Sequence, residues 1–363
     1  MIELKKLLAE VTSKGASDIH LKVHNYPFIR VEGELTPLTE YGLLRTEDTA
    51  MLAKEILNPR QQEIFVRESE VDLSFGVKNV GRFRLAVFQQ RGAVSMSFRI
   101  IPTAVANFES LNLPPILIEI IETLRGLVLV TGITGSGKTT TLAAMVRHLN
   151  ESKSCHILTI EDPIEFLFED DKAIISQREV ANDTTNFASG LRSAMRQDPD
   201  VIMVGEMRDL ETVRTALQAA QTGHLVLSTL HTTDAITTVD RIVSLFPVDQ
   251  QRDVRIQLSS ALNAVVSMRL IRSSISGRRL PAVEILRSTE QVQSLIIQPE
   301  RTKEIRGAME EGQSTYGMQT FDTSILKHYQ NDVISAEDAL KYATSPADLR
   351  LKMKGIVGAS ESV

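Results

Sequence analysis

A glycine-rich octapeptide, Gly132-Ile133-Thr134-Gly135-Ser136-Gly137-Lys138-Thr139, lies between a short run of apolar residues and an amphipathic helical pattern. It has the form G-x4-G-K-T, whose glycines let successive backbone N–H groups curl around phosphate oxygens without steric clash. The helix that follows directs its positive end at the same anion. The chain is therefore expected to join a buried strand to a helix through a phosphate-binding loop.

Two side chains of this loop have separate roles toward a nucleoside triphosphate. Lys138 places a positive charge on the β- and γ-phosphates, and the Thr139 hydroxyl is a ligand for Mg²⁺. The alternative is a glycine-rich turn that merely joins strand to helix, and the matching patterns on both sides argue against it. We therefore expect ATP and Mg²⁺ as cofactors, with further binding contacts from Gly132, Thr134, Gly135, Ser136, Gly137 and Thr140.

Apolar runs and helical patterns alternate around the loop. Near-continuous apolar strands separated by amphipathic helices are typical of a buried, mostly parallel sheet, which predicts the α/β fold class. The expected strands are 127–130, 157–160, 201–204 and 225–227, with helices over 142–149 and 210–220.

The N-terminal part has a different period. A helical spacing at Leu4–Val11 is followed by apolar and polar residues that alternate at 19–23, 71–77 and 94–100, with turn residues at 79–81. This pattern predicts a small α+β domain on an antiparallel sheet with one solvated face. The predicted organisation is this domain at 1–102, a linker at 103–115, an α/β core at 116–284, a helical region at 285–357 and a disordered tail at 358–363.

The amino-acid composition excludes several classes of function and structure. The 363 residues include 40 Lys and Arg against 46 Asp and Glu, and the net charge of −6 argues against a general nucleic-acid surface. The single cysteine, Cys155, excludes an internal disulfide framework and a multi-cysteine zinc site. No apolar run reaches the roughly 18 residues of a spanning helix, and no signal-peptide core is present, so we expect a cytoplasmic protein without direct membrane insertion.

An acidic residue follows the predicted strand 201–204. In many phosphate-loop enzymes an Asp ends this strand, but here Gly205 takes its place and Glu206 comes next. Glu206 is therefore the first candidate for the Mg²⁺ shell or for activating water. The alternative is a solvated carboxylate that stabilises a helix N-terminus.

A second acidic cluster, Glu161–Glu165, follows the strand 157–160. Its three carboxylates repel one another unless a cation or a proton-transfer role compensates. A solvated loop is the alternative. Glu161 and Glu165 become catalytic candidates because the cluster lies between the phosphate loop and Glu206 in the sequence.

One histidine lies at each end of the predicted strand 225–227. Lone histidines are more often core or surface groups than functional ones. His231, at the far end of the strand, is a candidate for sensing the γ-phosphate or contacting a neighbouring subunit. His224 precedes the strand.

In combination these motifs resemble the secretion and type IV pilus motor ATPases, and within them the type IV pilus retraction ATPases (the PilT family). The resemblance covers most of the chain, from residue 16 to residue 320. It is carried by Gly81–Arg84, Phe98–Pro102, the loop 134–141, Glu161–Glu165, Gln197–Asp200, Gly205–Asp209 and Thr222–His231.

The resemblance implies an ATPase that forms a homo-hexamer, in which a PAS-like N-terminal domain and a RecA-like core move as ATP is hydrolysed. It implies type IV pilus retraction through pilin depolymerisation, and hence twitching motility. The implied partner is an inner-membrane pilus platform protein, which would hold the motor peripherally at the membrane.

The resemblance also implies residue roles. An atypical Walker B role falls on Glu206, and arginines of the N-terminal domain complete the ATP site. Surface arginines on strands are the alternative for these last residues. The implied catalytic set is Glu206, Glu165, Glu161, His231, His224, Arg82, Arg84 and Arg99, with Thr139 and Glu206 at Mg²⁺.

Two departures from the family pattern bear on function. Ile133 stands where the family usually has Pro, a change that spares every phosphate contact. Gln291–Gln298 replaces the retraction signature A-I-R-N-L-I-R-E and lacks both of its arginines and its acid. An accessory pilus motor or a type II secretion motor therefore stays an alternative. A nucleic-acid translocase, suggested only by Arg269, Arg272, Arg278 and Arg279, and an ATP-binding regulator without hydrolysis are less favoured.

Overall fold

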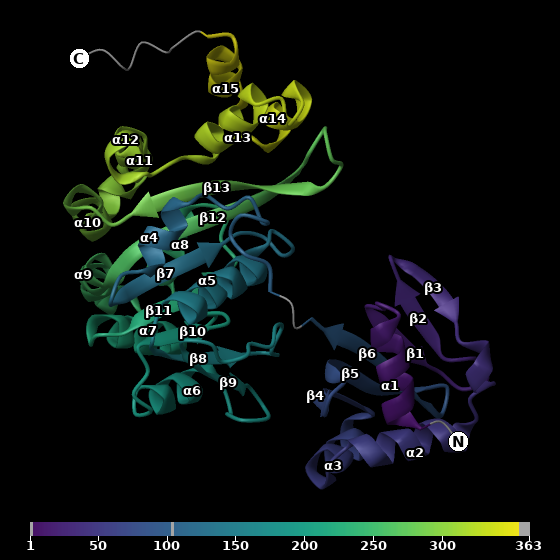
Figure 1. The fold of residues 1–363 in the computed structure, drawn as a ribbon. Coiled ribbons are helices and arrows are strands. Elements are labelled where there is room, and N and C mark those ends of the chain that lie inside the picture. The colour runs from purple at the N-terminus through teal and green to yellow at the C-terminus, as the bar shows by residue number, and fades with distance from the viewer. Residues whose placement is uncertain (1–2, 103–104, 356–363) are drawn as a thin grey trace. The chain divides into compact units, whose positions relative to one another are not determined.

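The computed structural model describes residues 3–102 and 105–355, and its contacts divide the chain into two units (Figure 1). The first unit holds α1 to β6 together with the loop segment Pro163–Leu167, and the second holds the other described residues. Part of the predicted linker, residues 103 and 104, and the predicted tail 358–363 lie outside the described residues. The domain limits drawn from the sequence stay a prediction.

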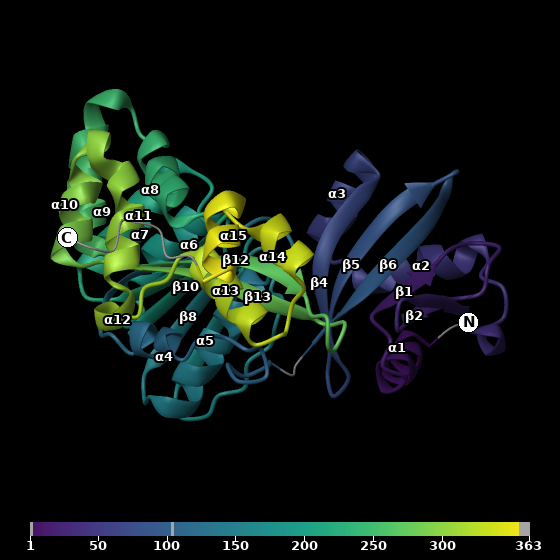
Figure 2. The same ribbon diagram turned by 90° about the horizontal axis from the view of Figure 1, so that it is seen from above.

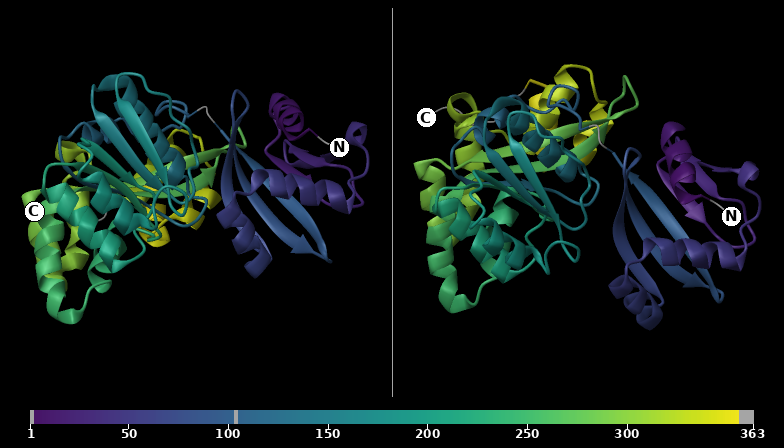
Figure 3. Two further views of the ribbon diagram at one scale, coloured as in Figure 1. Left: turned by 90° about the horizontal axis from the view of Figure 1, so that it is seen from below. Right: turned by 60° about the horizontal axis from the view of Figure 1, so that its bottom comes forward.

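The first unit is built on an antiparallel sheet of six strands. Its order is β3 (Glu34–Pro37), β2 (Phe28–Val31), β1 (Asp18–Leu21), β6 (Ala93–Ile101), β5 (Gly81–Gln90) and β4 (Glu70–Val77). Helices α1 (Leu4–Ser13) and α2 (Thr46–Ile56) cover one face (Figure 3), and α3 (Pro59–Glu68) leads into β4. The predicted α+β class is confirmed. Strand β5 was not predicted, although Phe83, Leu85 and Val87 alternate along it and are buried.

The second unit contains a sheet of seven strands. Its order is β13 (Arg279–Arg287), β12 (Leu262–Arg272), β7 (Gly126–Thr131), β11 (Leu225–Leu230), β10 (Val201–Val204), β8 (His156–Glu161) and β9 (Ile174–Glu179). All neighbours are parallel except β12 and β13. The four predicted strands and the mostly parallel sheet are confirmed. The sequence interpretation missed β9, β12 and β13, and its boundary at residue 284 falls within β13.

Helices cover both faces of this sheet (Figure 2). On one face α4 (Ile116–Ile121) and α5 (Lys138–Ser152) bury an apolar cluster. The other face packs against a larger group of helices with its own apolar cluster. These helices are α6 (Phe187–Ala194), α7 (Leu210–Gln221), α8 (Ala235–Ser244), α9 (Gln251–Ala261), α10 (Glu290–Ile297) and α11 (Ile305–Glu311).

The chain continues through α12 (Gln313–Tyr316) into three helices that pack on the β12–β13 hairpin. They are α13 (Phe321–Gln330), α14 (Ala336–Tyr342) and α15 (Pro346–Met353). Their small core joins Phe321, Ile325 and Leu349 to Ile271 and Ala282 of the hairpin. Among the described residues, no helix is both long enough and apolar enough to span a bilayer.

Candidate active site

The carboxyl ends of four neighbouring strands define one edge of the second sheet. Thr131 at the end of β7 pairs with Leu230 of β11, and Val204 of β10 pairs with both Ser228 of β11 and Ile160 of β8. Ligands of open α/β sheets bind at this edge. The phosphate loop, Glu206 and His231 follow β7, β10 and β11, and Glu161 is the last residue of β8.

The phosphate loop follows β7 and has a backbone that suits glycine. Gly132, Gly135 and Gly137 have φ values of 145°, 79° and 97°, which L side chains rarely adopt. A Cβ on Gly132 would lie 2.4 Å from the Ser136 Oγ and 2.7 Å from the Met268 carbonyl oxygen. Within the described residues, the N–H groups of Gly135, Gly137, Lys138 and Thr139 have no hydrogen-bond acceptor. The loop therefore presents a ring of donors suited to an anion.

Lys138 is the first residue of α5 and its side chain folds back over the loop. Its Nζ donates to the carbonyl oxygens of Gly132 at 2.8 Å and of Ile133 at 3.0 Å. Burial lowers the pKa of the ammonium, and the Glu206 carboxylate partly opposes that shift. The Lys138 ammonium has neutral carbonyl groups and no carboxylate as its hydrogen-bond acceptors. Its positive charge is therefore available to bind phosphate oxygens.

The hydroxyl residues of the loop differ in environment. Ser136 is buried, and its Oγ has no hydrogen-bond partner in the described part of the chain. Thr139 is exposed in the first turn of α5, and its hydroxyl makes no hydrogen bond to any described residue. Thr134 is exposed and Thr140 is half-buried. The Thr139 hydroxyl is thus available for a ligand.

Glu206 lies two residues beyond the end of β10 and is held by an arginine and a histidine. The Arg208 Nη2 is 2.8 Å from its Oε2, and the His231 Nε2 is 3.2 Å from its Oε1. At Gly205, just before it, a Cβ would lie 3.3 Å from the Ile160 carbonyl oxygen, so the chain passes close to β8 there. The tertiary structure thus brings together Glu206 and His231, which the sequence singled out separately.

The carboxyl of Glu206 is mostly buried. Burial alone would raise its pKa, but the hydrogen bond from Arg208 and the charges of His231 and Arg208 outweigh it, so the pKa lies below its usual value. Glu206 is therefore a carboxylate at neutral pH. The sequence interpretation did not assign a role to Arg208, although it stands within the Gly205–Asp209 motif.

The two acids of the other cluster have different surroundings. Glu161 ends β8 and is buried, and its Oε1 accepts hydrogen bonds from the Thr159 hydroxyl at 2.7 Å and from the Gln177 amide at 3.1 Å. Glu165 is exposed, in the segment Pro163–Leu167 that groups with the first unit. Glu161 thus has the contacts of a structural carboxylate at the same sheet edge as Glu206.

His224 does not join this cluster within one chain. It precedes β11 at the opposite edge of the sheet, where its carbonyl accepts from the Gly126 N–H and its Nδ1 lies 3.0 Å from the Ala219 carbonyl oxygen. The parallel strand β11 separates it from His231. A catalytic role for His224 therefore requires a neighbouring subunit.

The three predicted arginines belong to the first unit. Arg84 lies directly opposite Arg99 on the neighbouring strand, and Arg82 shares their face, which is opposite to the face covered by α1 and α2. The Arg99 Nε donates to the Asp18 Oδ1 at 2.9 Å. Like charges directly opposite each other on antiparallel strands repel. Asp18 offsets the charge of Arg99, whereas Arg84 is exposed and is the member of the pair suited to an anion.

A cavity of about 260 Å³ adjoins the phosphate loop. Its walls come from the loop itself, the residues after β11, β12 and the end of α14. Arg269 and Tyr342, which the sequence interpretation gave no role at this site, both line it. The full lining is Gly132, Ile133, Gly135, Ser136, Thr233, Met268, Arg269, Leu270, Arg279 and Tyr342.

Comparisons with known proteins agree with this geometry. The sequence model of a family described as "Type II/IV secretion system protein" matches residues 1–354. The "Type IV pilus retractation ATPase PilT" of Pseudomonas aeruginosa is 44% identical over 345 residues, which cover 95% of this chain and 99% of the relative. A "Twitching motility protein" of Neisseria gonorrhoeae is 44% identical over 317 residues, 87% of this chain and 84% of the relative.

A solved structure is also similar. The crystal structure of the pilus retraction motor PilT with bound ADP is 43% identical in sequence and has a TM-score of 0.87. The match covers 96% of this chain and 99% of that chain. The fold around the phosphate loop is thus the RecA-like fold expected from the sequence.

Proposed function

Since this chain belongs to the type II/IV secretion system protein family, and within it to the pilus retraction ATPases, we propose that it is the ring-forming motor that withdraws type IV pili. The chain binds nucleotide and is an ATPase. The observation that carries the proposal is the phosphate loop with its unpaired N–H groups, which shares one sheet edge with the ionised Glu206.

The residues at this edge of the sheet have different roles in ATP hydrolysis. The loop N–H groups and Lys138 hold the β- and γ-phosphates, and Glu206 orients and polarises the attacking water. The free Thr139 hydroxyl and the Glu206 carboxylate fit a bound Mg²⁺, which would neutralise charge on the phosphates. His231 and Arg208 keep Glu206 ionised and in place.

Glu165 is our candidate for a second acid that acts on water, and Glu161 supports the loop that carries it. The resemblance to the family and the position after β8 support this assignment. His224 would contact a neighbouring subunit from the opposite edge of the sheet.

We infer that the active unit is a homo-hexamer in which Arg82, Arg84 and Arg99 complete the ATP site. Because Asp18 offsets the charge of Arg99, it is the exposed Arg84 opposite it whose charge supports an anionic ligand. Phosphoryl-transfer sites often take an arginine from a neighbour, and such a residue neutralises the charge that develops in the transition state.

The mechanical output is pilin depolymerisation through an inner-membrane platform protein, with the motor held peripherally at the cytoplasmic side. One observation favours a second candidate, an accessory pilus motor or a secretion motor with another output. The α10 segment Gln291–Gln298 lacks the charged residues of the retraction signature. The net charge of −6 argues against a nucleic-acid translocase.

A deletion strain tests the proposal. Loss of twitching motility with surface pili retained, restored by the wild-type gene but not by Lys138→Ala, is the expected result. Normal motility in the deletion strain would overturn retraction as the output. A defect in protein secretion with normal motility would support the second candidate.

A further inference from the structure

Glu284 is a buried carboxyl on β13 that the proposed mechanism does not use. It is 8% exposed, and its Oε1 accepts a hydrogen bond from the Ala235 N–H at 2.8 Å. Ala235 is the first residue of α8, which begins four residues after His231. The side chain of Glu284 therefore ties β13 to the loop that carries His231.

Further hydrogen bonds hold the same end of this loop against α8. The Asp234 side chain caps α8 by accepting from the Thr237 N–H, and the hydroxyls of Thr232 and Thr238 are 2.6 Å apart. Thr233, between them, lines the cavity beside the phosphate loop. A shift of the amino end of α8 would therefore move His231 relative to Glu206.

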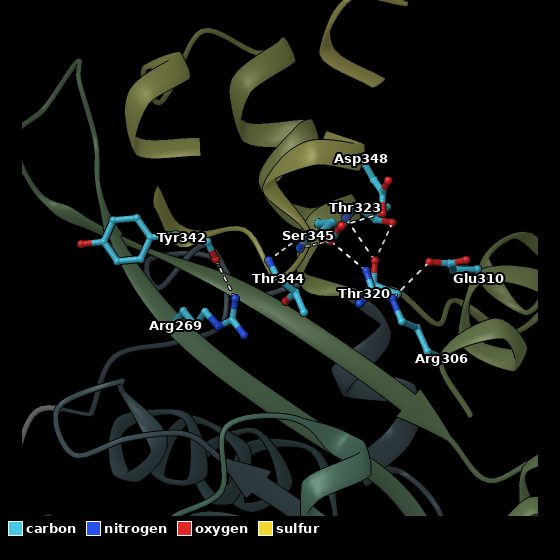
Figure 4. Close-up of polar contacts among 10 residues, drawn as sticks. Arg269, Arg306, Glu310, Thr320, Thr323, Tyr342, Thr344, Ser345 and Asp348 are labelled. Atoms are coloured by element: carbon cyan, nitrogen blue, oxygen red, sulfur yellow. Dashed lines mark hydrogen bonds and ion pairs between the residues drawn. The ribbon is translucent and has the colours of Figure 1, made fainter. Parts of the chain in front are cut away.

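Arg269 on β12 extends the same connection to the C-terminal helices. Its guanidinium stacks on the Phe321 ring at 3.8 Å. Its Nη1 donates to the Tyr342 carbonyl oxygen at 2.6 Å (Figure 4). Phe321 begins α13 and Tyr342 ends α14. Both Arg269 and Tyr342 also line the cavity.

Asp322 joins these helices through three hydrogen bonds. It accepts hydrogen bonds from the Thr344 N–H at 2.6 Å and the Ser345 N–H at 3.0 Å, and from the Arg306 Nη2 at 2.9 Å. Its side chain therefore links α13 to α11 and to the turn before α15. A displacement of Tyr342 is passed to all three elements.

We propose that Glu284 and Arg269 are positioning residues for ATP hydrolysis, which hold the His231 loop and the C-terminal helices in one arrangement around the nucleotide. The inference rests on the proposed mechanism, in which His231 and Glu206 act together. The C-terminal helices then change position with the state of the nucleotide.

The charge of Glu284 strengthens this connection. The groups that face it are Asp234 at the start of α8, Arg269 on β12, and the N–H groups of Ala235 and Phe321, with Asp322 acting on Arg269. The carboxylate accepts N–H hydrogen bonds more strongly than the neutral acid does. Burial raises the pKa of Glu284 to about 7, with a further rise from Asp234. The hydrogen bond to the Ala235 N–H is therefore strongest above about pH 7, although burial makes the ionised carboxyl less stable overall than the neutral acid.

Glu284→Gln tests the proposal, because the amide keeps the shape and loses the charge. At pH 8 we expect kcat for ATP to fall by about 10- to 100-fold, with KM changed less than threefold, since displacement of a catalytic group affects the chemical step. The matched control is Glu290→Gln, an exposed residue six positions further along, which should behave as wild type.

The dependence of kcat on pH distinguishes a positioning role of Glu284 from a merely structural role. Wild-type kcat should rise through a midpoint near pH 7. Glu284→Gln should lack this step. A variant profile and kcat equal to wild type would overturn the proposal, and so would a raised KM with unchanged kcat.

Hydrogen exchange gives a second readout and reports whether the variant folds. In the wild-type chain, ADP should slow amide exchange in the phosphate loop and in the first turns of α8 and α13. In Glu284→Gln, and in Arg269→Lys, only the phosphate loop should respond. Equal protection of α13 in all three proteins would overturn the connection, whereas an absence of wild-type ATPase activity would contradict the proposed function itself.

Discussion

Burial removes the Lys138 ammonium from water, and its hydrogen-bond acceptors are neutral carbonyl groups of its own loop. Such a cation gains more from a phosphate than an exposed lysine does, because the surrounding protein screens the charge poorly. The charged groups of the candidate site, Lys138 and Glu206, are thus held in fixed positions by neighbouring residues before ATP binds.

Lys138→Ala should therefore reduce phosphate release to background, because the β- and γ-phosphates lose their fixed counter-charge. Lys153→Ala, at the other end of α5, is the matched control and should retain wild-type turnover. Malachite-green phosphate release measures both variants. Turnover in Lys138→Ala comparable to wild type would contradict the assignment of the loop.

Glu206→Gln should bind ATP but hydrolyse it about 10² to 10⁴ times more slowly, because the amide retains the shape and cannot polarise water as a carboxylate does. Single-turnover kinetics and a nucleotide-binding titration separate the two effects. Unchanged single-turnover rates would exclude Glu206 as the residue that acts on water.

The two acids after β8 should respond differently to the same change. Glu165→Gln should slow hydrolysis, whereas Glu161→Gln should chiefly lower stability, because the Thr159 and Gln177 donors lose a charged acceptor. Thermal melts and phosphate release distinguish them. If Glu161→Gln is stable but inactive while Glu165→Gln is normal, the assignment within the cluster is wrong.

At the scale of elements, the turn from β7 into α5 depends on close approach of backbone to side chain. Gly132→Ala places a methyl group against Ser136 and the Met268 carbonyl oxygen at a φ of 145°. It should lower the free energy of unfolding by about 1–3 kcal/mol and abolish ADP binding. Gly307→Ala in α11 meets no atom within 4 Å and should raise stability by about 0.5–1 kcal/mol. Urea unfolding measures both, and equal effects would contradict the strain argument.

The contact between β13 and α8 predicts a pH-dependent stability. Glu284 has a raised pKa in the folded state, about 7 against a usual value of 4.5, so its stabilising contribution is fully present below pH 4.5 and is lost as the pH rises through about 7. The loss amounts to about 3 kcal/mol. Glu284→Gln should therefore gain stability relative to wild type between pH 5 and pH 8. A constant difference across this range in urea unfolding would show that Glu284 does not titrate there.

For the whole molecule, the central prediction concerns assembly. If an arginine from a neighbouring subunit completes the site, specific activity should fall on dilution, because a missing arginine at a transferring phosphoryl group costs about 10³ to 10⁵ in rate. Light scattering should show the fall to coincide with dissociation. Constant specific activity in verified monomers would exclude a shared site and with it the hexameric motor.

Mixing variants provides an independent test. Lys138→Ala subunits have intact arginines, and Arg84→Ala subunits have an intact phosphate loop, so mixed interfaces should regain activity that neither variant has alone. A concerted ring in which one inactive subunit stalls the others would suppress this rescue. The concentration dependence is therefore measured on the same samples.

The local sequence determined the phosphate loop, the parallel strands on either side of it, and the antiparallel N-terminal sheet. These features depend on residues close in the chain: glycines that permit positive φ, and apolar spacings of two or 3.6 residues. Strand β12 contains apolar residues, but no glycine or proline separates it from α9, so its start was not recognised. The boundary at residue 284 fell within β13 because no glycine or proline lies between that strand's end and α10.

Only the tertiary structure determined which of the predicted site residues contact one another. The strand order β7-β11-β10-β8 places His231 against Glu206 and leaves His224 at the opposite edge, although both histidines flank one strand. The contact of Glu284 with Ala235 joins residues 49 positions apart. Strand order and burial follow from packing over the whole chain, so side-chain partners, and the pKa shifts that they cause, appear only once the sheet is assembled.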